Sequence, residues 1–139
     1  MKKISNISKS LIVVLVLFVV CIFNMYPSCN VSTASLSDVK VCGALGSDGD
    51  CSSGASSMPA SSPVIYCSAQ LKNAPSGTKV TFTWKHNDES IASADVETSS
   101  AVVNSTLKTN GSLEPGKYSV TVKLNTDNAT PVTKEFTIE

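Results

Sequence analysis

The sequence has no arginine and a single histidine, His86, among its 139 residues. Without arginine or a run of basic residues, nucleic acids and other phosphate-rich partners are not expected. A histidine-activated nucleophile needs its base in a structured site, whereas His86 belongs to the predicted turn "HNDES" at 86–90, where a solvated histidine is the ordinary case. The nucleophile-elbow, zinc-protease and phosphate-loop motifs are also missing. We therefore expect no enzyme and no cofactor.

Metal-binding patterns are missing as well. No two cysteines are closely spaced, and His86 is the only imidazole, so a zinc site is not expected. The stretch "DGD" at Asp48–Asp50 lacks the alternating acids and the final glutamate of a calcium loop. We interpret it as a turn, and we expect no metal.

The N-terminus has a basic head and an apolar core. Three lysines and no acid precede the apolar run Leu11–Phe23, whose only polar interruption is Cys21. As a helix, this run would cover about 20 Å, which is less than the roughly 30 Å of a bilayer core. The pattern predicts a secretory signal peptide at 1–28 that is cleaved, with an uncleaved N-terminal anchor as the alternative.

Two cleavage sites fit the residues after this run. The stretch "YPSC" at 26–29 resembles the bacterial lipobox, with Ser28 and Cys29 matching that pattern and Tyr26 and Pro27 departing from it. This resemblance implies that Cys29 is acylated and becomes the new N-terminus. Cleavage after Ala34 is the alternative, because "STA" places small residues where signal peptidase needs them. The chain is therefore expected at the outer face of a bacterial or archaeal membrane, or secreted.

The part after the signal has its own composition. It holds eight lysines against eleven acidic residues, a net charge of −3, which favours solubility. About 110 residues are enough for one domain. Serine and threonine are abundant and leucine is scarce, so strands and loops are favoured over helices.

The cysteine pairing cannot be settled from the sequence. An exported chain sits where disulfides form. Cys42 and Cys67 each end a short strand-like stretch, "DVKVC" and "PVIYC", and we predict a disulfide between them. Cys42 with Cys51 is the alternative, because the spacing between those two is short.

Residues 29–62 and 63–139 differ in composition and in hydrophobic pattern. The first range, rich in serine and glycine, predicts a flexible spacer with a possible first strand near 38–42. In the second, stretches such as "KVTFTWKH" and "KYSVTVKL" alternate apolar and polar residues, as half-buried strands do. About six or seven such strands predict one antiparallel β-sandwich. Its expected core positions are Val80, Phe82, Trp84, Val120, Val122, Phe136 and Ile138, with Ile91 among the weaker ones.

A resemblance supports this fold. "LEPGKYSVTV" at 113–122 resembles the corner of fibronectin-III-like and other immunoglobulin-like modules. The resemblance gives roles to Leu113, Pro115, Gly116 and Tyr118, and it implies that the tyrosine hydroxyl bonds back to the turn. The stretch 65–84 also resembles an immunoglobulin-like module of prokaryotic secreted proteins with no assigned activity. An all-β, immunoglobulin-like sandwich is expected.

These observations lead to a functional expectation. The chain is expected to be a membrane-anchored cell-envelope protein with a non-catalytic binding or structural module, and its partner an unidentified protein or envelope polymer. Loops 86–90 and 125–131 are candidate binding faces by analogy with other sandwiches. The alternative is a free secreted protein that acts as an inhibitor, or as a subunit of a surface assembly through pairing of an edge strand such as 132–139.

Overall fold

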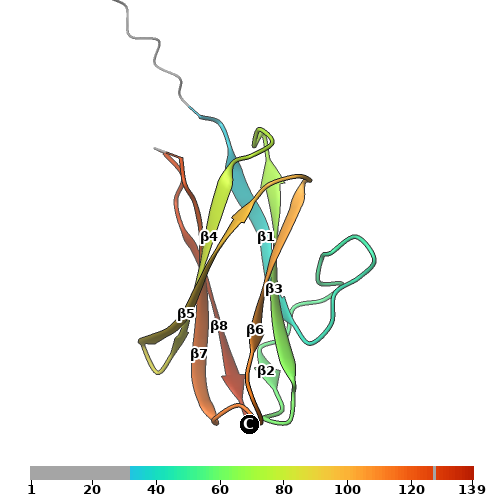
Figure 1. The fold of residues 1–139 in the computed structure, drawn as a ribbon, viewed down its shortest axis with the longest axis vertical. Coiled ribbons are helices and arrows are strands. Elements are labelled where there is room, and N and C mark those ends of the chain that lie inside the picture. The colour runs from blue at the N-terminus through green and yellow to red at the C-terminus, as the bar shows by residue number, and fades with distance from the viewer. Residues whose placement is uncertain (1–31, 127) are drawn as a thin grey trace, which may run out of the picture. The chain divides into compact units, whose positions relative to one another are not determined.

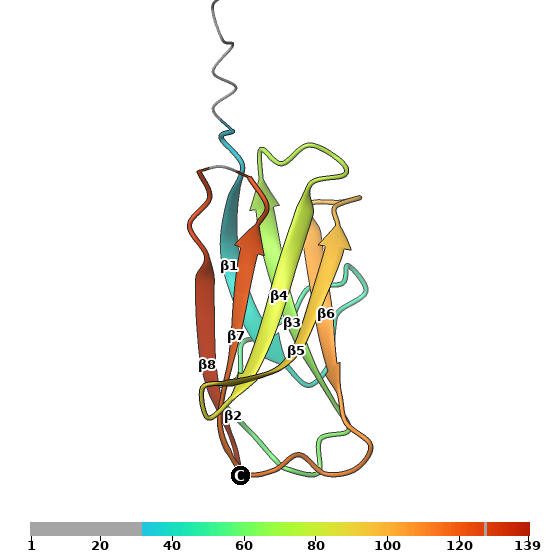
Figure 2. The same cartoon turned by 60° about the vertical axis from the view of Figure 1, so that its left-hand side comes forward.

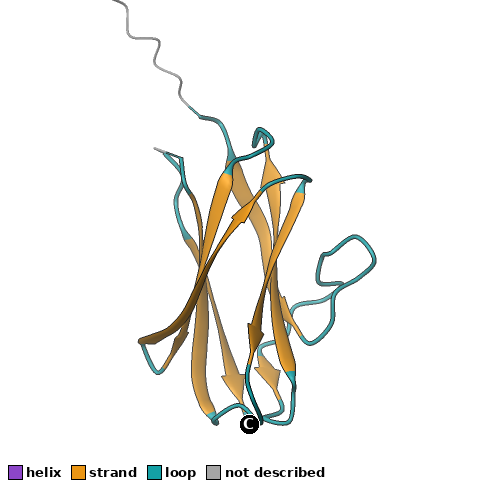
Figure 3. Cartoon of the chain, viewed as in Figure 1, coloured by secondary structure: helices purple, strands orange, loops and turns teal. Residues whose placement is uncertain are grey.

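The computed structural model describes residues 32–126 and 128–139, and all regular structure within them is β-strand (Figure 3). In that part of the chain we find no helix with the length and apolar character needed to cross a membrane. The predicted signal peptide at 1–28 and the predicted lipid attachment at Cys29 lie outside the described residues. The eight strands are β1 (Ser35–Cys42), β2 (Ser57–Met58), β3 (Val64–Lys72), β4 (Lys79–His86), β5 (Glu89–Glu97), β6 (Val102–Lys108), β7 (Gly116–Leu124) and β8 (Val132–Ile138).

The strands form two sheets, which Figures 1 and 2 show as two layers. One sheet has the order β1-β3-β6 and the other β2-β8-β7-β4-β5. Neighbouring strands are antiparallel, except that β2 runs parallel to β8. β8 pairs with β7 along its length and with β2 only at Thr137 and Ile138, and β5 is the opposite edge of the larger sheet.

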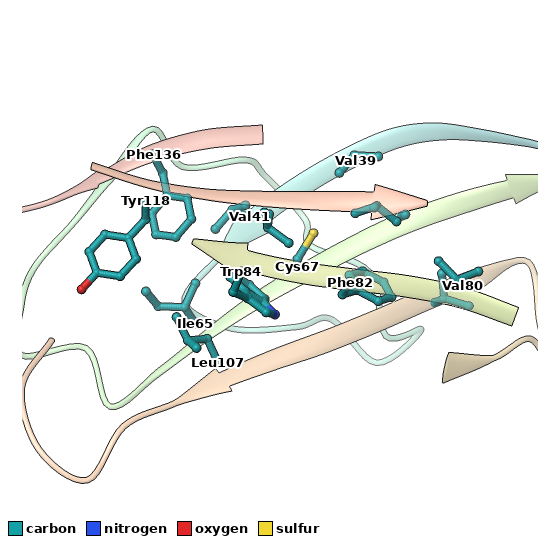
Figure 4. Close-up of a cluster of buried hydrophobic side chains, with 14 of the residues drawn as sticks. Val39, Val41, Ile65, Cys67, Val80, Phe82, Trp84, Leu107, Tyr118 and Phe136 are labelled. Atoms are coloured by element: carbon teal, nitrogen blue, oxygen red, sulfur yellow. The ribbon is translucent and has the colours of Figure 1, made fainter. Parts of the chain in front are cut away.

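The core lies between the two sheets. β4 and β7 pair so that Phe82 faces Val122 and Trp84 faces Val120, which puts their apolar residues on one side of the sheet. Side chains from β1 and β3 fill the space opposite them (Figure 4). Each of the seven core positions named from the alternation is at most 2% exposed. Burying large apolar side chains in this way contributes roughly 1.5–3 kcal/mol each.

Trp84 lies in the middle of this core with its polar atom satisfied. Its indole Nε1 donates a hydrogen bond to Ser105 Oγ of the opposite sheet at 3.4 Å. Its ring meets the ring of Phe136 edge to face, with centroids 6.3 Å apart and planes at 85°. A buried tryptophan with a partner for its N–H adds area without leaving a donor unpaired.

Ile91 does not join the core, so its predicted inward position is wrong. Its side chain is 46% exposed. The ladder between β4 and β5 shifts register here, because Trp84 pairs with Ala92 whereas Lys85 pairs with Ser90. Ile91 is therefore the extra residue of an irregular step, and it leaves the alternation that the sequence suggested.

The folded part begins well before residue 63. β1 pairs with β3 from Ser35 onward, and β2 joins the end of β8. The serine- and glycine-rich composition conceals six buried apolar positions, which are Ala34, Val39, Val41, Cys42, Cys51 and Met58. Much of the predicted spacer at 29–62 thus forms one edge of the sandwich.

Candidate functional site

The two loops named as candidate binding faces lie at opposite ends of the sheets. His86, at the end of β4, pairs with Tyr118 near the start of β7. Loop 86–90 therefore adjoins the start of β7, whereas loop 125–131 follows its end. The C-terminus lies at the first of these ends (Figure 1), which we call the corner end. β1 starts at the other end, at Ser35, which we call the N-terminal end. The two loops cannot form one surface.

A tight turn closes the β4–β5 hairpin at the corner end. His86 and Glu89 pair across it, which leaves Asn87 and Asp88 as its two residues. Both have positive φ, 46° and 70°, a conformation that asparagine and aspartate tolerate better than most residues. The Asn87 backbone N–H donates to the Lys117 carbonyl at 2.8 Å, and the Asn87 side-chain oxygen accepts from the Lys117 N–H at 3.3 Å. The turn is therefore held against the start of β7.

The corner before β7 is held by a hydrogen bond from a tyrosine side chain. The Tyr118 hydroxyl donates to the backbone carbonyl of Glu114 at 2.8 Å. Leu113 is buried, whereas Pro115 is exposed on the turn. Burial, together with the nearby Glu114 carboxylate, raises the pKa of Tyr118 above its usual value. The hydroxyl thus stays protonated and can serve as a donor.

Three stacked rings form the base of the corner end. Tyr118 stacks on His86, with centroids 4.3 Å apart, and on Phe136, at 5.5 Å. Gly116 passes so close that a Cβ there would lie 2.7 Å from the His86 Nε2, and its φ is +148°. Only glycine fits this position without displacing the imidazole. His86, with its side chain 15% exposed, is therefore a packed ring and not the solvated residue that the sequence suggested.

The outer face of β7 and β8 is hollowed beside the Asn87–Asp88 turn. The hollow has a volume of about 320 Å³. Tyr118 and Phe136 also border it, but they are only 4% and 2% exposed, so their rings offer little surface. Its polar lining comes from Asp88, Lys117, Glu135, Ser56, Ser119 and Thr137. A cation, two carboxylates and three hydroxyls can hydrogen-bond a polar ligand, but they supply no pairing of nucleophile and base.

A second group of polar side chains lies on the outer face of the three-stranded sheet. The Asp50 carboxylate accepts hydrogen bonds from Ser68 Oγ, from Gln70 Nε2 at 3.0 Å and from Lys40 Nζ at 3.2 Å. These bonds, that from Ser68 most of all, outweigh the cost of burial and lower the Asp50 pKa to about 2. Lys40 also contacts Asp38 at 2.8 Å, and that bond is the main cause of its raised pKa.

This polar group holds a loop in place. The loop runs between Cys42 and Cys51, and we call it the disulfide loop. The Cys51 N–H donates to Ser68 Oγ at 2.9 Å, and Asn104 donates to the Gly49 carbonyl at 3.1 Å. Sequence reasoning read Asp50 only as a turn residue, since nothing in its spacing points to partners eighteen and twenty positions away. The arrangement is a structural clamp and not a reactive site.

The predicted disulfide between Cys42 and Cys67 is wrong, because Cys42 is bonded to Cys51 at a Cα–Cα distance of 5.9 Å. The register of β1 on β3 explains the pairing. Val41 lies opposite Cys67 and faces the core with it, whereas Cys42 lies opposite Tyr66 on the outer face, where Cys51 is found. Cys67 is a free, fully buried thiol, and burial raises its pKa to about 12, which makes it unreactive.

Of the two polar groups, the hollow can bind a ligand, whereas the group around Asp50 holds the disulfide loop. In residues 32–126 and 128–139, no cluster of three or more histidine, cysteine or acidic side chains could hold a metal ion. No family model matches the chain, and no curated protein sequence matches it.

Proposed function

We propose that the chain is an exported cell-envelope protein, held at the membrane by its N-terminus, whose immunoglobulin-like sandwich binds a partner without catalysis. The basic head and apolar run of the first 28 residues support export. The Cys42–Cys51 disulfide is compatible with it, because such bonds persist in oxidising compartments.

The strand order supports the immunoglobulin-like part of the proposal. Leaving out the two-residue β2, the first, second and fifth strands form one sheet, and the seventh, sixth, third and fourth form the other. Immunoglobulin-like sandwiches distribute their strands in this way, with a fourth strand added beside the third in some of them. The hydrogen bond from Tyr118 to Glu114 is the corner contact of the same family.

The direction of the chain favours one end as the binding end. Five residues separate Cys29 from Ser35, the first residue of β1. Fully extended, this stretch spans about 20 Å. A lipid on Cys29 would thus keep the N-terminal end, with loop 125–131, near the membrane. The corner end would be directed outward, to where an envelope partner is found.

The observation that carries the binding proposal is the hollow of about 320 Å³ at this corner end. It carries charges of both signs beside three hydroxyl-bearing residues, and its position is fixed by the bonds between Asn87 and Lys117. A polar segment of a protein or of an envelope polymer is the partner that such a surface fits.

The anchor can be tested by measuring the intact mass of the mature protein from membrane and medium fractions, before and after reduction. A mass that begins at Cys29 and includes acyl chains is expected in the membrane fraction, with a gain of two protons on reduction. A lipid-free mass that begins at Ser35, found only in the medium, would contradict the anchor.

The binding face can be tested with two lysines of β7. Lys117 borders the hollow, and Lys123 lies on the same face of the same strand near the N-terminal end. The purified protein is incubated with isolated envelopes of the producing cells, and the retained fraction is measured. Lys117→Glu should lower retention severalfold, whereas Lys123→Glu should not. Equal retention of the wild type and both variants would rule out the hollow.

A further inference from the structure

β5 is an edge strand of the larger sheet, and beyond the irregular step at Ile91 it pairs regularly with β4 from Ala92 to Glu97. The other edges carry protection against edge pairing: β1 contains Lys40 and a register shift beside Asp38, and β8, which β2 covers only at its last two residues, contains Lys134. β6 is an edge of the smaller sheet and ends in Lys108. β5 runs for nine residues and contains neither lysine nor proline, the residues that commonly block edge pairing.

The backbone bonding of β5 identifies which of its groups are free. Thr98, directly after β5, bonds to the β4 side through both its N–H and its carbonyl. Because successive residues of a strand direct these groups to opposite sides, Val96, Ala94 and Ala92, up to the irregular step, bond to β4. The free side of the strand therefore carries the N–H and carbonyl groups of Ser93, Asp95 and Glu97.

The side chains of β5 leave room for a neighbour. Ala92, Ala94 and Val96 lie on the core side of the sheet, opposite Trp84, Phe82 and Val80 of β4. Nevertheless Ala94 is exposed and the other two are only half-buried, since no strand of the smaller sheet covers them fully. Ile91, at one end of this row, is the large hydrophobic residue exposed within the described chain.

We propose that β5 binds β5 of a second copy of this chain, antiparallel and centred on Ala94. In this register, Ala94 faces Ala94 of the second copy, Ala92 faces Val96 of the second copy, and Ser93 faces Asp95 of the second copy. Small apolar residues therefore meet on one face of the joined sheet, and a hydroxyl meets a carboxylate on the other face. The free backbone groups of Ser93 and Asp95 then bond to each other across the pair.

The charges of β5 select this register over its neighbours. If the pair of strands were centred on Ser93, Glu89 of one copy would lie opposite Glu97 of the other. If it were centred on Asp95, the two Asp95 carboxylates would lie opposite each other. Like charges directly opposite each other destabilise a sheet. Only the register centred on Ala94 among these three avoids such a pair, and the two larger sheets then join across a two-fold axis. This inference uses neither the hollow nor the anchor.

Two lysine substitutions test the docking. In Ala94→Lys, two ammonium groups would lie directly opposite each other at the centre of the pair. In Ser93→Lys, the ammonium would face Asp95 of the second copy. The mass of the purified mature protein is followed by sedimentation up to about 1 mM, where weak pairs assemble. The wild type and Ser93→Lys should double in mass, and Ala94→Lys should stay monomeric. A wild type that is monomeric throughout, or an Ala94→Lys variant that dimerises equally, would overturn the proposal.

Two cysteine substitutions test the register. Ala94→Cys would place two thiols in a pair that lacks backbone bonds, at a separation that a disulfide spans. In Ala92→Cys, on the same strand and face, the two thiols would lie four residues out of register. Mild oxidation should therefore yield a reducible dimer with Ala94→Cys that is several-fold more abundant than with Ala92→Cys. Equal cross-linking of the two variants would refute this register.

Discussion

The Cys42–Cys51 disulfide closes a loop with a sequence separation of nine residues. In the chain-entropy description, opening a loop of this length costs about 2.5 kcal/mol of stability. For a domain of roughly 100 residues, that loss corresponds to a fall in the melting temperature of about 10–20 °C. We expect a loss of at least this size when the bond is reduced. The opened loop gains chain entropy in the unfolded state, and it also loses its fixed position over Ser68 and Gln70 in the folded state.

The assay is equilibrium unfolding of the purified protein in denaturant, with and without a reducing agent. The Cys42→Ser/Cys51→Ser double variant is the control, because its stability should match that of the reduced wild type and should not change on reduction. The gain of two protons in the intact mass verifies that one bond was opened. A reduced wild type that loses less than about 0.5 kcal/mol would refute the reasoning, since the loop would then contribute nothing through its closure.

Three further predictions follow from single contacts. Tyr118→Phe keeps the stacked ring but removes the bond to Glu114, so the free energy of unfolding should fall by about 1 kcal/mol, whereas Tyr66→Phe, which removes no such bond, should leave it unchanged. Because the pKa of Asp50 is lowered, its ionised carboxylate contributes to the free energy of unfolding above about pH 4, and this contribution is lost as the pH falls towards 2. The Asp50→Asn variant should be less stable than the wild type at neutral pH, and its stability should decline less across this pH window. Gly116→Ala should cost at least about 1 kcal/mol in thermal unfolding, because its Cβ would collide with the neighbouring imidazole, whereas Gly43→Ala meets no atom within 4 Å and should be neutral.

The sequence predicted the all-β class well because period-two alternation is a local signal. Val80, Phe82 and Trp84 alternate with polar residues over a single short stretch, and only a strand places them on one face. The same logic failed at Ile91, since an irregular step in the ladder depends on the partner strand and leaves no mark in the β5 sequence. Alternation thus predicts a strand more securely than it predicts which way each residue points.

The disulfide and the clamp could not be predicted for a different reason. Which cysteine pairs with Cys42 depends on the register of β1 against β3, which sets the faces of Val41 and Cys67. The partners of Asp50 come from two strands and meet only after the loop has folded over them. Such contacts are consequences of tertiary structure, so the composition of 43–62 suggested a linker where the chain builds part of the domain.

The hollow illustrates which part of a binding surface can be predicted from the sequence of a turn. "HNDES" indicated a turn at 86–90, and the structure has a turn at Asn87–Asp88. Whether this turn can serve as a binding face depends on Lys117 and Glu135, which lie on other strands. Only the pairing of β7 with β4 and β8 brings these side chains together. A candidate loop was therefore recognisable from the sequence, whereas the site was not.

The two proposals constrain each other through strand direction. Antiparallel pairing of β5 reverses one copy relative to the other, so the two N-terminal ends of the dimer point in opposite directions. With only five residues between Cys29 and Ser35, two copies that both stand upright on one membrane cannot reverse in this way. Lipid-anchored chains that stand upright and pair through β5 would therefore join two facing surfaces, whereas released chains would pair in solution. The mass at the N-terminus distinguishes anchored from released chains, and the Ala94 variants test the pairing itself.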